Sequence, residues 1–226
     1  MPLLILLRAT YRVAWKDVVG DWRRRATLSS MLFFAIAVLV VFQVAFDPDR
    51  QEATRLLPGL LWATVLFTSL MGLGRVFQAE EEDGGLEGLL LASVPRGVLF
   101  FGKWLGNLLL TVLVELLLLP LTLVLFNVDV WGQLPALIGV LLLGTLGLTG
   151  LGVLLAAMTQ TARSRETLLA LLLLPLTAPL LIAGVQAMAG LLDPSLELGS
   201  WMRLLVIFDV VYLALAPWAF GWLVAE

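Results

Sequence analysis

Acidic side chains gather in one short segment of a chain that otherwise carries little charge: Glu80, Glu81, Glu82, Asp83 and Glu87. Asp83 is suited to cap a short helix, and Glu87 would lie in its first turn, where a carboxylate favours the helix dipole. The spacing of Leu86, Leu89 and Leu90 places these leucines on one face of that helix. One interpretation is a helix that binds a soluble partner protein, and the other is a solvated loop that only holds the chain outside the membrane.

A second group of polar residues recurs within a long apolar stretch. Every fourth residue is polar in the series Lys103, Asn107, Thr111 and Glu115. At a rise of 1.5 Å per residue, Glu115 lies about 18 Å beyond Lys103, close to the middle of a bilayer. The series predicts either hydrogen bonds to neighbouring helices or a polar seam along a dimer interface or a substrate route.

Two other charged residues flank or enter the apolar stretches. Asp209 lies within the last of them, and we expect it nearer the outer face of the membrane than Glu115. Arg75 lies at the inner end of the second stretch, too near the cytosol to pair with Glu115. We count both among the intramembrane polar candidates.

The composition indicates an integral membrane protein. Hydrophobic residues make up 61% of the 226 residues, charged residues 14%, and the mean hydropathy is +1.01. Soluble domains carry about a quarter charged residues. The absence of cysteine and histidine excludes disulfides, cysteine-bound metals and histidine-based catalysis, so we predict no catalytic residue and no metal site. The net charge of −3 and the lack of a basic tract give no indication of nucleic-acid binding.

Stretches with little or no charge predict an all-α protein with a single transmembrane domain over residues 1–226. The six predicted spans cover about 26–46, 56–77, 98–126, 136–158, 167–190 and 204–225. Residues 2–21 are too charged to cross the membrane and predict an amphipathic helix in the interface, with Trp15 and Trp22 at headgroup depth. The alternative for this segment is a frayed tail.

The distribution of lysine and arginine predicts the orientation. With six spans, both termini share one side with the segments around 78–97 and 159–166, and that side holds eleven of the fourteen basic residues. Because basic residues favour the cytoplasmic side, we expect both termini and the acidic segment in the cytoplasm.

The fourth span is rich in small residues: Gly144, Thr145, Gly147, Thr149, Gly150, Gly152 and Ala156. Small side chains let helix backbones approach closely. We expect this face to pack within the subunit rather than at a dimer contact.

The stretch RVFQAEEEDGGLEGLLLASVPRGVLFFGK resembles the corresponding part of the CcmB family, the membrane subunit of the ABC-type haem exporter of cytochrome c maturation. The residues in matching order are Arg75, Phe77, Glu80, Glu82, Gly85, Leu86, Glu87, Leu89, Leu90, Pro95, Arg96, Gly102 and Lys103. A looser form of this motif is shared by the wider class of ABC-2-type permeases.

The resemblance implies that residues 80–97 form a cytoplasmic coupling helix that binds a separate ATP-hydrolysing subunit. By analogy, Leu86, Leu89 and Leu90 would fill an apolar cleft of that subunit, while Glu80, Glu82 and Glu87 would pair with its basic residues; Gly85, Pro95 and Arg96 complete the motif. The chain has no phosphate-binding loop of its own, so ATP would be bound by the partner.

The resemblance also implies the rest of the complex. The chain would form a homodimer in the bacterial cytoplasmic membrane, with a CcmA-like ATP-binding subunit and a CcmC-like haem-handling subunit. Haem is then the candidate cargo, or ATP drives release of a haem-carrying chaperone. Without histidine or cysteine to ligate haem, we expect another subunit to hold it.

The sequence is also compatible with two other functions. The same architecture could move a lipid, a polysaccharide or a drug. A different class is a proton-coupled secondary transporter that uses Glu115 and Asp209 as proton sites, for which a neutral Glu115→Gln change would abolish activity. A membrane enzyme fits least, since the sequence shows no nucleophile–base pair or metal cluster.

Overall fold

The computed structural model describes residues 2–24, 26–77, 95–160 and 162–223. Within these ranges the ordered elements are helices, which confirms the predicted all-α class. They are α1 (Pro2–Arg24), α2 (Ala26–Phe46), α3 (Arg50–Leu73), α6 (Arg96–Leu125), the 3₁₀ turn η1 (Trp131–Gln133), α7 (Leu134–Thr159), α8 (Arg165–Leu192) and α9 (Gly199–Leu223).

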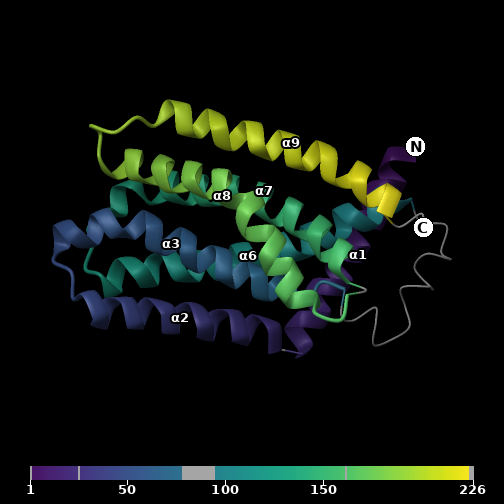
Figure 1. The fold of residues 1–226 in the computed structure, drawn as a ribbon, viewed down its shortest axis with the longest axis horizontal. Coiled ribbons are helices and arrows are strands. Elements are labelled where there is room, and N and C mark those ends of the chain that lie inside the picture. Colours follow the sequence, from purple (N-terminus) through teal and green to yellow (C-terminus); the bar gives the residue numbers. More distant parts are fainter. Residues whose placement is uncertain (1, 25, 78–94, 161, 224–226) are drawn as a thin grey trace.

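Six of these helices, all except α1, are long and apolar enough to cross a membrane, as the sequence predicted. They run lengthwise through the bundle, and the marked N and C ends of the chain lie at the same end (Figure 1). An even number of crossings accounts for this placement of the two ends. The protein is therefore a multi-pass membrane protein.

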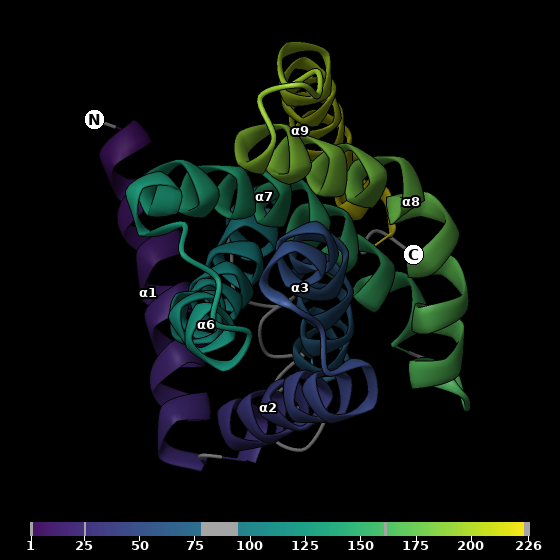
Figure 2. The same cartoon turned by 90° about the vertical axis from the view of Figure 1, so that its left-hand side faces the viewer.

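Helix α1 runs across the spans at the end of the bundle that carries the termini (Figures 1 and 2). One face exposes aromatic side chains, including Tyr11, Trp15 and Trp22, while Ala14 on the other face is buried. This division of exposed aromatic and buried small residues is that of a helix lying at a membrane surface.

The centre of the bundle is organised around Trp62 of α3, which is fully buried. Its indole ring lies against Gly144 of α7 and Gly184 of α8, at positions where a β-carbon would overlap the ring. Farther along α7, Gly150 receives Leu213 of α9 and Gly152 receives Leu73 of α3. The small residues of α7 thus pack within the subunit, as expected, and α7 forms the middle of the bundle.

Helix α8 bends midway along its length (Figure 1), where Pro175 and Pro179 lie within the helix. A proline inside a helix removes one backbone hydrogen bond and displaces the preceding turn. Thr177, between the two prolines, donates its hydroxyl to the Leu173 carbonyl at 2.7 Å, and Tyr212 of α9 donates to the Leu176 carbonyl at 2.8 Å. These bonds satisfy polar groups at the bend and hold it against α9.

The contact between Trp62 and Gly144 yields a first prediction. Gly144→Ala places a methyl group in the volume of the indole ring, and overpacking of this kind destabilises by about 1–3 kcal/mol. We expect a lower midpoint of thermal unfolding in detergent. Gly139→Ala on the same helix is the control, because the position of its β-carbon is open. Equal midpoints for the two variants would contradict the central role of this contact.

Candidate functional site: the polar contacts that flank residues 78–94

Most of the predicted coupling residues lie outside the described residues. They are Glu80, Glu82, Gly85, Leu86, Glu87, Leu89 and Leu90. The coupling helix therefore stays a prediction. The described chain reaches Phe77, in a turn after α3, and resumes at Pro95, directly before α6. The contacts of these two flanks show what the segment is attached to.

Lys103 connects three elements on one side of the attachment. Its side chain is only 2% exposed, and its Nζ lies 3.1 Å from Asp17 Oδ2 of α1. The same Nζ donates to the Val76 carbonyl at 2.9 Å and lies 5.5 Å from the centroid of the Phe77 ring. A buried ammonium needs such partners, because losing one would leave an uncompensated charge. Lys103 thereby joins α1 and α6 to the exit of α3.

Two glycines of α6 let α1 approach closely enough for this ion pair. A β-carbon at Gly102 would lie 3.3 Å from the Thr10 carbonyl, and one at Gly106 would lie 3.3 Å from Asp17 Cβ. Glycines four residues apart form a groove on one face of a helix, and here α1 fills it. The spacing of Gly102 and Gly106 was readable in the sequence, but their partner helix was not.

The C-terminal part of α9 contacts both flanks. Arg96, the first residue of α6, donates from Nη1 to the Gly221 carbonyl at 2.8 Å. The Phe220 ring lies 6.4 Å from the Phe77 ring and 5.6 Å from the Phe100 ring, measured between centroids. These distances are typical of favourable aromatic contacts. Both flanks of residues 78–94 therefore contact α9.

The polar series of α6 faces the interior of the protein along its whole length. Asn107, Thr111 and Glu115 are all buried, like Lys103. Asn107 Oδ1 lies over Gly72 of α3, 3.0 Å from the position of a β-carbon there, and Thr111 donates to the Asn107 carbonyl at 3.0 Å. Each fourth residue advances about 40° round a helix, so the series turns by about 120° from Lys103 to Glu115.

That rotation brings Glu115 to α7. Thr145 donates its hydroxyl to Glu115 Oε1. Among the described residues, none forms a hydrogen bond with Glu115 Oε2. Glu115 as a whole is 3% exposed, so one carboxyl oxygen is bonded to α7 and the other is buried without a hydrogen bond to the described residues.

Asp209 of α9 occupies the other side of α7. Its Oδ1 lies against the backbone of Gly147, and a β-carbon at that position would collide with it. Gly147 is two residues from Thr145, about 3 Å along the helix axis. The structure thus corrects the expectation that Asp209 lies nearer the outer face: the two buried carboxyl groups lie at nearly the same depth, separated by α7.

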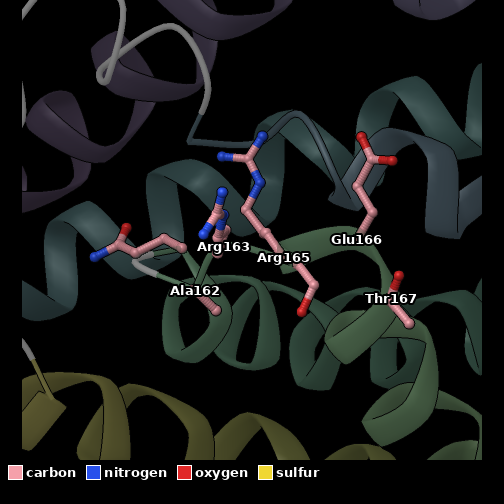
Figure 3. Close-up of a pocket in the computed structure, with 7 residues that line it drawn as sticks. Ala162, Arg163, Arg165, Glu166 and Thr167 are labelled. Carbon is pink, nitrogen blue, oxygen red and sulfur yellow. The ribbon is translucent and has the colours of Figure 1, made fainter.

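Two arginines line a hollow of about 380 Å³ at the connection between α7 and α8 (Figure 3). This connection lies at the same end of the bundle as the termini (Figure 1). Arg163 and Arg165 extend toward the same side of this hollow. Glu166 Cγ lies 3.9 Å from the β-carbon position of Gly74, so the hollow adjoins the turn after α3 that contains half-buried Arg75. In the sequence these arginines contributed only to the orientation.

The described polar groups join helices to one another at one end and within the spans. No group of three metal-ligating side chains occurs in the part of the chain that the structure describes. These features define a polytopic membrane protein whose helices are joined to one another by polar contacts.

The chain belongs to the CcmB protein family, whose pattern it matches over residues 8–225. This confirms the family that the motif around residues 75–103 indicated. It is 32% identical to heme exporter protein B of Bradyrhizobium diazoefficiens over 217 residues, covering 96% of this chain and 94% of the relative. It is 36% identical to heme exporter protein B of Pseudomonas aeruginosa (86% and 85% covered) and 37% identical to that of Escherichia coli K12 (79% and 80% covered).

The Lys103–Asp17 contact yields a second prediction. Lys103→Met removes the charge that holds α1 and leaves Asp17 without this ion-pair partner, so we expect α1 to separate from α6 more often. Val13 lies against Gly102 in this contact, and the chain has no native cysteine. A Val13→Cys reporter should therefore react with a maleimide at least about tenfold faster beside Lys103→Met, which corresponds to about 1.4 kcal/mol.

The control is the same reporter beside Arg12→Met, which removes an exposed charge from α1 itself. An equal reaction rate in both backgrounds would show that the ion pair does not hold α1 in place.

Proposed function

We propose that this chain is the membrane permease subunit of an ABC-type haem exporter that serves cytochrome c maturation. The match to the CcmB family over residues 8–225 carries this proposal, because it spans the six apolar helices as well as the acidic segment. The relatives named heme exporter protein B cover most of the same length, which supports extending their function to the whole chain.

In this proposal a separate CcmA-like subunit binds and hydrolyses ATP, and residues 80–97 couple it to the spans. Movement of this segment would reach the bundle through its two flanks. On the flank before residue 78, Val76 accepts a hydrogen bond from Lys103 and Phe77 contacts the end of α9. On the flank after residue 94, Lys103 contacts α1 and Arg96 contacts the end of α9. The contribution of this chain is thus mechanical, while the chemistry of ATP belongs to the partner.

The remaining assembly follows from the same proposal. Two copies of the chain would form the permease in the bacterial cytoplasmic membrane, with both termini cytoplasmic. Haem, as cargo or on a chaperone released by the complex, would be held by a CcmC-like membrane subunit. Eleven of the fourteen basic residues would then lie on the cytoplasmic side, in keeping with the preference of such residues for that side.

Charge reversal in the acidic segment tests the coupling. Tagged wild type and a Glu82→Lys/Glu87→Lys variant are purified from native membranes in detergent, and their partners are identified by mass spectrometry. We expect to recover the ATP-binding subunit with wild type and at least about tenfold less of it with the variant. The two lysines would face the basic residues of the partner, so attraction between opposite charges would become repulsion between like charges.

The matched control is Glu52→Lys/Asp129→Lys, which reverses two exposed acidic residues, one in the first turn of α3 and one between α6 and α7. The start of α3 and the connection from α6 to α7 lie at the end of the bundle away from the termini (Figure 1). This control should retain the ATP-binding subunit. If tagged wild type remains folded but recovers no ATP-binding subunit, the proposed coupling through residues 80–97 is wrong.

The two buried carboxyl groups allow a test against proton-coupled transport. Asp209→Asn keeps the size of the side chain and removes its ability to carry a proton. A permease driven by ATP should still support at least about half of wild-type c-type cytochrome formation, measured by haem staining in cells that lack the native gene. Complete loss with normal protein levels would instead favour a proton-coupled mechanism.

A further inference from the structure

A groove between α6 and α7 lies on the lipid-facing side of the bundle at the depth of Glu115. Its walls consist of apolar side chains, namely Val112, Leu116, Leu119, Ile138, Leu141 and Leu142. Leu116 is 46% exposed and Leu142 is 37% exposed, so the groove opens outward between them. Glu115 is the polar residue in the lining.

The free volume of the groove is only about 10 Å³. This is at the lower limit of what one ordered water needs, so the groove cannot enclose a small-molecule ligand. Its shape suits a surface that seats a neighbouring helix and admits the tip of one side chain.

One oxygen of the Glu115 carboxyl group lacks a partner within the described residues. Thr145 satisfies Glu115 Oε1 from the α7 side, and Oε2 is buried with no hydrogen bond. In the bilayer an unsatisfied polar group costs several kcal/mol, and lipid tails offer no donor. The missing hydrogen bond must therefore come from another polypeptide or remain unmade.

We propose that the α6–α7 groove seats a membrane-spanning helix of a companion subunit, which brings one hydrogen-bonding side chain to Glu115. The proposal deepens the proposed function and rests on it for the existence of a companion membrane subunit. It assigns Glu115 to subunit assembly rather than to transport of protons.

A second copy of this chain fits the groove less well. In a two-fold symmetric contact formed across the groove, the same patch of each copy meets the other. Apart from Glu115 the lining of that patch is apolar, so a second copy would offer Glu115 either an apolar side chain or another acid. A helix of different sequence meets the requirement directly.

Photo-cross-linking from position 116 tests the proposal in native membranes that contain the whole complex. The photoreactive residue p-benzoylphenylalanine replaces Leu116 in one variant and Leu117 in a matched control. Leu117 is 50% exposed, close to the 46% of Leu116, but points about 160° away from Glu115 round the helix. Adducts are sized on gels, and their cross-linked peptides are identified by mass spectrometry.

We expect an adduct at position 116 that joins this chain to a membrane span of a companion subunit, with a polar side chain within one turn of the cross-link. The control at position 117 should give at least about tenfold less of it. An adduct of two copies of this chain, or attachment to lipid alone, would overturn the proposal. The ATP-binding subunit is measured in the same sample. Its absence would contradict the proposed function, whereas its presence without an adduct to a companion subunit would contradict the proposed role of the groove.

A second pair of variants separates the hydrogen bond from the shape of the groove. With the photoreactive residue kept at 116, Glu115→Leu should lower the companion adduct about fivefold, the change expected for losing one interhelical hydrogen bond. Glu115→Gln should restore it, because its amide both accepts and donates. Equal adduct from all three would show that Glu115 takes no part in seating the helix.

Discussion

A polar group inside a bilayer must find its hydrogen-bond partner within protein, and this constraint shapes α6. The helix carries an ammonium group at one end and a carboxyl group near its middle, both buried. Lys103 meets Asp17 and the Val76 carbonyl, while Glu115 meets Thr145. These partners lie on α1, on α7 and in the turn after α3, so satisfying the polar groups of α6 also decides which elements surround it.

Contacts of the same kind make the end of the bundle that carries the termini one connected unit. Helix α1 is held by glycines and an ion pair, and the end of α9 is held by Arg96 and an aromatic cluster. Both sets of contacts meet at the flanks of residues 78–94. In the proposed coupling, a displacement there would be passed to α1 and α9 through these short contacts.

Charge-free stretches predicted the number of spans, and the four-residue period of α6 predicted that its polar residues share a drifting face. Composition and period are local properties, so one sequence reveals them. Pairings are not local. The contact of Gly102 and Gly106 with α1, the seat of Trp62 and the shared depth of Glu115 and Asp209 depend on which helices become neighbours. The helical structure and the partner contacts of residues 80–90 stay predictions, because these residues lie outside the described ones.

The seat of Trp62 has a consequence for biosynthesis. This tryptophan belongs to the second span, but the glycines that receive it belong to the fourth and fifth. While the chain is being inserted, α3 enters the membrane before α7 and α8 have been translated. Until then its indole ring contacts lipid or the insertion machinery instead of the two glycines. The contact is complete only when α8 is present, so truncated chains that end before Gly184 can form at most its Gly144 half.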